Sequence, residues 1–125
     1  MSEKDIQRAI NRGAEIKRIA HEALRRGHRL IVAAAANNVI RIHEILREET
    51  VPEDVYFGAI LAAATNSAFT SLRALALSNE ERMFAVSNVG NWQVANTLIQ
   101  TAVDPHQLQH DIDTLESFSG YNGPD

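Results

Sequence analysis

The sequence predicts an all-α fold, a short stack of antiparallel helix pairs. The composition is dominated by alanine, leucine, glutamate, arginine and glutamine, with only three prolines and six glycines, and this favours helix. Apolar residues recur at spacings of three and four, the period of an amphipathic helix. A run of small residues followed by a polar break occurs three times, at 31–38, 60–67 and 83–90, and an amphipathic stretch follows each break. Each unit therefore predicts helix, tight turn, helix, within an α-solenoid or a compact helical bundle.

The first predicted helix begins at Ser2, an N-cap residue followed three positions later by Asp5. Apolar residues then recur at helical spacing as far as Leu24. Gly13 is a possible break, so this stretch is one helix or two short ones. The helix ends in two arginines and Gly27, because cations suit the C-terminal dipole and glycine suits a left-handed cap.

Three helix pairs follow. The inner helix of the first pair, about 28–36, is almost wholly small and apolar, so we expect it to be buried on most sides. Asn37 and Asn38 end it, because asparagine tolerates left-handed geometry and caps the next helix. Proline and two acids open the second inner helix at 52–54, and a capping box at 78–81 opens the third. The outer helices are expected over 39–46, 68–75 and 91–98, with Trp92 as a core or groove residue.

A last helix is predicted from about Pro105 to Glu116, with Asp104 as its cap. Residues 118–125 have no period, so we expect a flexible C-terminal tail. No long linker divides the rest, and residues 1–117 are expected to form a single helical domain.

A gap-free alignment of the three outer helices places Asn38, Ser67 and Gly90 at equivalent turn positions. Ala34, Ala63 and Val86 stand four residues before them. This pattern resembles a degenerate ankyrin repeat, in which an Ala-Ala pair closes the inner helix and a glycine turn leads to an outer helix ending in leucines. The turns are 29 and 23 residues apart, whereas the ankyrin period is about 33. The resemblance implies protein–protein binding through inner-helix and loop positions.

The net charge of −4 hides a split between the two parts of the chain. Residues 1–47 carry ten Lys/Arg against five Asp/Glu, and residues 48–125 carry two against eleven. This asymmetry predicts one basic and one acidic face, or head-to-tail self-association into a homo-oligomer, or complementarity satisfied within the monomer.

The basic part suggests contact residues for a partner. Lys4, Arg8 and Arg12 have i, i+4, i+8 spacing, and the hairpin over 33–46 superficially suggests a helix-turn-helix. A basic face of this kind can track phosphates, although no aromatic residues interleave with the arginines and the whole chain is acidic. Tyr56 is a candidate for the same surface, with packing as the alternative. The candidate partner-binding residues are Arg18, Arg25, Arg26, Arg29, Arg41 and Tyr56.

The candidate metal ligands are His106, His110 and Asp113, which share one side of the last helix. No glutamate follows His106 as a zincin motif requires, and a solvated polar face is the alternative. We expect no cofactor.

These features together favour a non-enzymatic protein–protein interaction module, an adaptor or small inhibitor that binds a larger protein through charged faces. One alternative is a nucleic-acid-binding regulator that uses the basic N-terminal helices, and another is a small metal-dependent protein that uses His106 and His110. Cysteine, a nucleophile elbow and a Gly-rich phosphate loop are all missing from the sequence. With no long apolar run and no signal-peptide pattern, we expect a cytoplasmic protein without a membrane partner.

Overall fold

The computed structural model describes residues 2–75 and 78–121, and all regular structure within these ranges is helical. The helices are α1 (Glu3–Arg26), α2 (Arg29–Ala35), α3 (Val39–Glu48), α4 (Glu53–Thr65), α5 (Phe69–Leu75), α6 (Asn79–Asn88), α7 (Trp92–Gln100) and α8 (Pro105–Tyr121).

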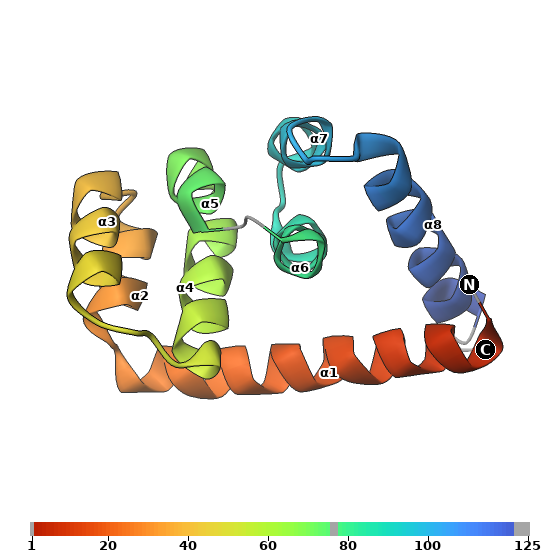
Figure 1. The fold of residues 1–125 in the computed structure, drawn as a ribbon, viewed down its shortest axis with the longest axis horizontal. Coiled ribbons are helices and arrows are strands. Elements are labelled where there is room, and N and C mark those ends of the chain that lie inside the picture. Colours follow the sequence, from red (N-terminus) through yellow and green to blue (C-terminus); the bar gives the residue numbers. More distant parts are fainter. Residues whose placement is uncertain (1, 76–77, 122–125) are drawn as a thin grey trace.

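Helix α1 forms a long base from which the helix pairs α2–α3 and α4–α5 rise (Figure 1). The third pair, α6–α7, is turned relative to the first two: its helices are seen end-on in Figure 1, where the first two pairs are seen lengthwise. Helix α8 then runs back from α7 toward the N-terminus of α1. The predicted all-α stack of antiparallel pairs is therefore confirmed.

Helix α1 is one continuous helix that passes through Gly13. Its ends are those the sequence predicts: the Ser2 hydroxyl accepts a hydrogen bond from the backbone N–H of Asp5 (3.2 Å), and Gly27 has a left-handed φ of 63°. A single glycine costs only about 1 kcal/mol in a helix interior. The strong caps and the buried residues Ile16 and Ala20 outweigh that cost, so the helix does not break.

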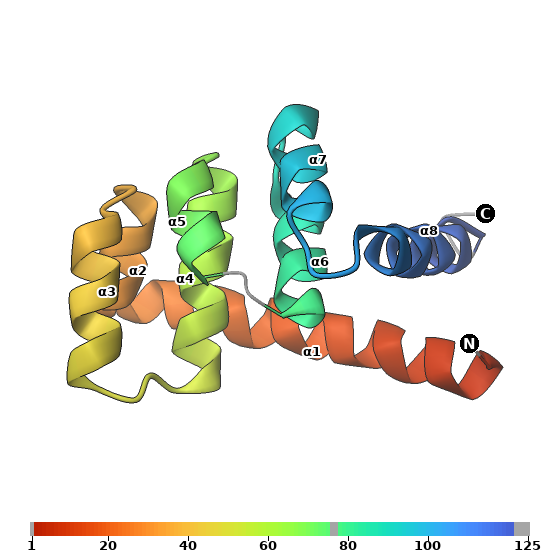
Figure 2. The same cartoon turned by 45° about the horizontal axis from the view of Figure 1, so that its top comes forward.

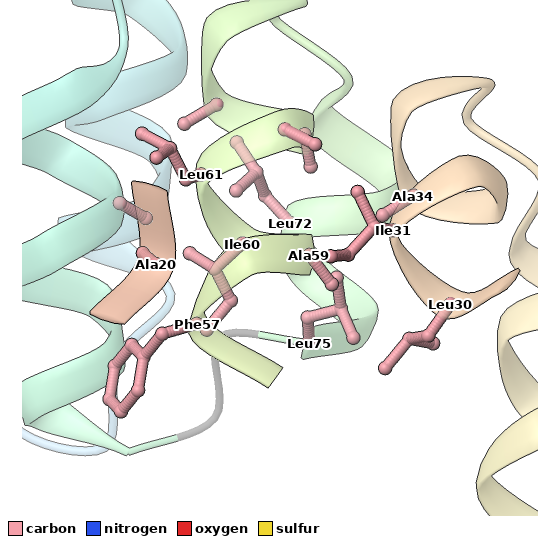
Figure 3. Packing of buried hydrophobic residues seen from close by; sticks show 14 of the residues in the cluster. Ala20, Leu30, Ile31, Ala34, Phe57, Ala59, Ile60, Leu61, Leu72 and Leu75 are labelled. Atoms are coloured by element: carbon pink, nitrogen blue, oxygen red, sulfur yellow. The ribbon is translucent and has the colours of Figure 1, made fainter. Parts of the chain in front are cut away.

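Helix α4 lies at the centre of the core and is apolar on all sides. Nine of its thirteen residues are buried, because α1, α2, α5 and α6 all pack against it. Figure 3 shows Ala20 of α1, Ile31 of α2 and Leu72 of α5 in the same cluster as Ile60. Gly58 allows the close crossing of α1 and α4, since a Cβ atom there would lie 3.0 Å from the Ala23 Cβ.

Helix α2 is buried unevenly. Leu30, Ile31, Ala33 and Ala34 are buried, but Val32 is 60% exposed. The pair α2–α3 stands at the end of the row of pairs, so only one neighbouring pair, α4–α5, packs against it (Figure 1). Helix α2 is therefore buried on most sides, as predicted, and the side that carries Val32 is the exception.

The first two hairpins share one turn geometry. Asn37 (φ 57°) and Ser67 (φ 50°) are left-handed, and the next residue donates its N–H to the carbonyl five positions earlier (2.9 Å) in each turn: Asn38 to Ala33 and Ala68 to Ala63. These are Schellman caps. Asn37 therefore corresponds to Ser67, and the alignment of Asn38 with Ser67 is one residue out of register. The third turn differs, because Val89 is extended (φ −82°, ψ 131°).

Asn37 also joins neighbouring pairs. Its Oδ1 accepts hydrogen bonds from the Thr70 hydroxyl (2.7 Å) and from the backbone N–H of Ser71 (3.0 Å), both in the first turn of α5. Ala68 precedes α5 and has no side-chain acceptor to cap it. The first hairpin therefore caps the outer helix of the second.

Helix α8 packs through a separate, small cluster. Leu108 and Ile112 are buried against Ile99 and Ala102 at the end of α7. The helix continues to Tyr121, past Glu116 where the sequence predicts its end, because no proline interrupts it before Pro124. The expected tail over 118–125 is thus helical as far as 121, and 122–125 lie outside the described residues.

Candidate functional site

Ion pairs between the basic and acidic parts of the chain gather where the helix pairs meet α1. The Arg12 guanidinium donates to Glu80 at the start of α6 (3.0 Å) and to Glu53 at the start of α4, and lies 5.9 Å from the centre of the Phe57 ring. Hydrogen bonds to Glu80 and then to Glu53 raise the pKa of Arg12. One α1 residue thus fixes the N-terminal ends of two inner helices.

Most of the predicted contact cations have carboxylate partners in the same chain. Arg26 pairs with Asp54, and Arg29 pairs with Glu48 (2.8 Å) and Glu49 (2.5 Å). The hydrogen bond from Arg29 lowers the pKa of Glu49, and the one from Arg26 lowers the pKa of Asp54.

The remaining predicted cations are more exposed. Arg18 pairs with Glu22 one turn along α1 (3.2 Å), and Arg41 lies 3.8 Å from Glu48. Arg25 is exposed and has no ion pair among the described residues. Four of the ten cations of residues 1–47 therefore pair with carboxylates of residues 48–125 within the monomer, which supports the third of the interpretations that the sequence left open.

Tyr56 serves the packing of the core. Its hydroxyl donates to the carbonyl of Leu75 (2.5 Å) and so caps the end of α5 from α4. Burial, and secondarily the charge of Glu81, raises the pKa of Tyr56 to about 12. Because the hydroxyl is engaged inside the chain, the packing interpretation of this residue is favoured over a contact with a partner.

The candidate metal ligands lie on α8. His106, His110 and Asp113 are exposed, and Asp113 accepts a hydrogen bond from the Gln109 amide (2.8 Å). In the described part of the chain, no three His, Cys, Asp or Glu side chains are placed to hold a metal ion.

Trp92 is 74% exposed, which corrects its assignment to the core or a groove. It shares a side of α7 with Ile99, seven residues later. Ile99 is buried against α8, but α8 starts near the C-terminal end of α7 and runs away from it toward the N-terminal end of α1 (Figure 1). The periodicity identified the correct side of α7, and the path of α8 leaves the first turn of that side uncovered.

The ends of the three hairpins are uncharged. We call residues 36–40, 65–70 and 87–93 the tip surface. The first two tips point the same way in both Figure 1 and Figure 2, and the third is turned relative to them, because α6 and α7 are seen end-on in Figure 1. Each tip lies inside a run without Asp, Glu, Lys, Arg or His, over 30–40, 55–72 and 83–103. Ile40 in the first tip is 76% exposed and Trp92 stands in the third. The uncharged runs are visible in the sequence, but only the fold shows that each run contains the end of a hairpin.

Arg82, like Trp92, has a position in the structure that the sequence does not indicate. Its side chain lies in the interior at 7% exposure, and its Nη1 donates to the Leu98 carbonyl and to the Thr101 hydroxyl (2.9 Å). Burial, and to a lesser extent the charge of Arg73, lowers the pKa of Arg82. The Arg82 guanidinium lies at the last carbonyls of α7, where the negative end of the helix dipole stabilises a cation. Arg82 therefore links α6 to α7.

No protein-family model matches the chain, and no curated protein or solved structure is detectably similar to it. Within residues 2–75 and 78–121, no helix combines the length and the apolar character needed to cross a bilayer.

Proposed function

We propose that this chain is a non-enzymatic protein–protein interaction module, an adaptor or small inhibitor, which binds a larger protein through its tip surface. The exposure of Trp92 carries the proposal. The centres of protein interfaces are poor in charged residues and rich in aromatic ones, and tryptophan is prominent among the residues that dominate binding energy. The tip surface combines an exposed tryptophan, an exposed isoleucine and neutral amide and hydroxyl groups.

The tip surface is a better candidate than the charged faces that the sequence predicts. Arg26 and Arg29 hold carboxylates of their own chain, and a partner would have to displace them. The tips carry no such ion pairs among the described residues, because they carry no charges. A partner with an apolar pocket for Trp92 and neutral hydrogen-bonding groups around it suits this surface.

A relationship to ankyrin repeats stays a prediction. The matching caps at Asn37 and Ser67, thirty residues apart, support a repeated unit in the first two pairs. The extended Val89 in the third turn departs from that unit.

The proposal is tested by comparing three forms of the tagged protein in affinity capture from its native cell. Ile40→Ser/Trp92→Ser removes both large apolar side chains from the tips and is expected to lose the captured partner. Val103→Ser is the matched control, because Val103 is fully exposed (101%) but lies outside the tips. It is expected to capture the partner as the unmodified chain does.

A direct readout is also available, since Trp92 is the single tryptophan. Its emission is expected to shift to shorter wavelength when the purified partner binds. Capture that survives in the tip variant but is lost in Arg18→Ala/Arg25→Ala would place the contact on the basic face instead.

A further inference from the structure

A cleft of about 550 Å³ is lined by residues of α1, α6 and α8; Figure 1 shows how these three helices are arranged. Its walls are mostly apolar and include Ile10, Gly13, Met83, Phe84, Ile112 and Leu115. This volume lies within the range of about 300–1,000 Å³ that small-molecule sites occupy. Ser87 and Asn88 line the cleft and also begin the third tip, so the cleft adjoins the tip surface at that point, whereas Ile40 and Trp92 lie outside the cleft lining.

The cleft exists because one side of α1 is covered unevenly. Ile6, Ala9, Gly13, Ile16 and Ala20 follow each other at spacings of three and four and so share one side of the helix. Ile6 is buried at one end of this row, and Ile16 and Ala20 are buried under the core at the other. Between Ile6 and Ile16, this row contains only Ala9 and Gly13.

Gly13 shows that the space is open. A Cβ atom built at Gly13 would meet no atom within 4 Å, so nothing in the chain requires glycine at this position. Glycine in a helix lets another molecule approach the backbone closely. The row of small residues thus forms the floor of the cleft.

The charges around the cleft are balanced. Arg12 and Lys17 of α1 face Glu80 of α6 and Glu116 of α8, and Arg12 and Glu80 already form an ion pair. Two cations and two anions give no preference to a charged ligand of either sign. Ser87 also lines the cleft; its hydroxyl donates to the Phe84 carbonyl (2.8 Å), so its oxygen can act as a neutral acceptor beside the apolar wall.

We propose that this cleft binds an uncharged, largely apolar small molecule, of the chemical class of a medium-chain alcohol. Its hydrocarbon body lies over Gly13 and against Met83 and Leu115, and its hydroxyl group lies at the rim near Ser87. The hydrocarbon body of such a ligand matches the apolar lining of the cleft, and its lack of a formal charge matches the balanced charges at the rim.

The test uses the neutral probe N-phenyl-1-naphthylamine, which becomes fluorescent in apolar sites. We expect saturable binding to the full chain, and 1-decanol should displace the probe at a concentration at least tenfold lower than decanoate or decyltrimethylammonium. Absence of saturable binding, or equal displacement by all three competitors, would overturn the proposal.

Two substitutions test whether the probe binds in the cleft. Gly13→Leu fills the floor and is expected to weaken probe binding at least tenfold without lowering the melting temperature. Asn11→Leu is the matched control, because it adds the same side chain to the same helix about 200° around its axis from Gly13. It should leave probe binding unchanged. Equal effects of the two variants would contradict the assignment, and Ala9→Leu repeats the test if Gly13→Leu does not fold.

Discussion

The two ends of α1 present the same kind of surface and are covered in different ways. At the C-terminal end, Ala20 and Ala23 lie so close to α4 that only glycine fits at position 58. At the N-terminal end, Ala9 and Gly13 are just as small, yet a Cβ atom on Gly13 would meet nothing. Small residues on a helix therefore do not by themselves show that another helix is packed against them. The closed end holds the main core, and the open end holds a cleft and the separate cluster beneath α8.

The largest expected effect contrasts the two glycines. Gly58→Leu forces a side chain between α4, Ala23 and Ile31, and should lower the free energy of unfolding by about 3 kcal/mol. Gly13→Leu has free space and gains helix propensity, so it should leave that free energy unchanged or raise it by up to about 1 kcal/mol. Urea denaturation followed by circular dichroism measures both. Equal losses of unfolding free energy in the two variants would contradict the difference between the two ends of α1.

The next effect tests how the first two pairs are joined at the closed end. Asn37→Ala loses the cap on α5 and places alanine in a left-handed conformation, and should cost about 2 kcal/mol. Asn37→Gly should cost about 1 kcal/mol, since it loses only the cap. The control is Ser67→Gly, at the equivalent left-handed position, which should stabilise the fold slightly. If Asn37→Ala and Asn37→Gly are equally stable, the left-handed turn contributes nothing.

A smaller effect concerns Tyr56, which joins α4 to the end of α5. Tyr56→Phe should lower the free energy of unfolding by about 1 kcal/mol at neutral pH, the worth of one hydrogen bond.

Because burial raises the pKa of Tyr56 in the folded chain to about 12, its contribution to stability is complete below pH 10 and is lost as the pH rises toward 12. Absorbance of tyrosinate at high pH checks this point. The part of the titration that disappears in Tyr56→Phe should be centred near pH 12, and a midpoint near 10 would show that the phenol is not buried.

The smallest effect belongs to the tip surface. Trp92→Ser should change the free energy of unfolding by less than about 0.5 kcal/mol, because α8 does not reach that turn of α7. A loss of 2 kcal/mol or more in a thermal melt would mean that Trp92 is packed, and would remove the support for the interaction surface.

The sequence predicts the helices well because their signals are local. The caps at Ser2, Asn38 and Ser78 each form the hydrogen bond that their position predicts. The exposed side of α2 and the position of Trp92 were missed, because both depend on which helix lies alongside. Periodicity identifies the inner side of a helix, and only the path of the whole chain decides whether that side is covered.

The site was less predictable than the helices. The charge split left three interpretations open, and the pairing of Arg12 with Glu53 and Glu80 depends on contacts 41 and 68 residues apart in the sequence. The cleft depends on the angle at which α8 returns to α1, and no local pattern encodes that angle.

Native-state hydrogen exchange tests the contrast between the closed and open ends most directly. Helix α4 is surrounded by the main core, whereas α8 rests on a small separate cluster beside the cleft. Amides of α4 should exchange only through global unfolding, and those of α8 through a local opening at least about tenfold more frequent. Equal protection of the two helices, with the same dependence on denaturant, would show that the chain opens as one unit and would contradict the contrast.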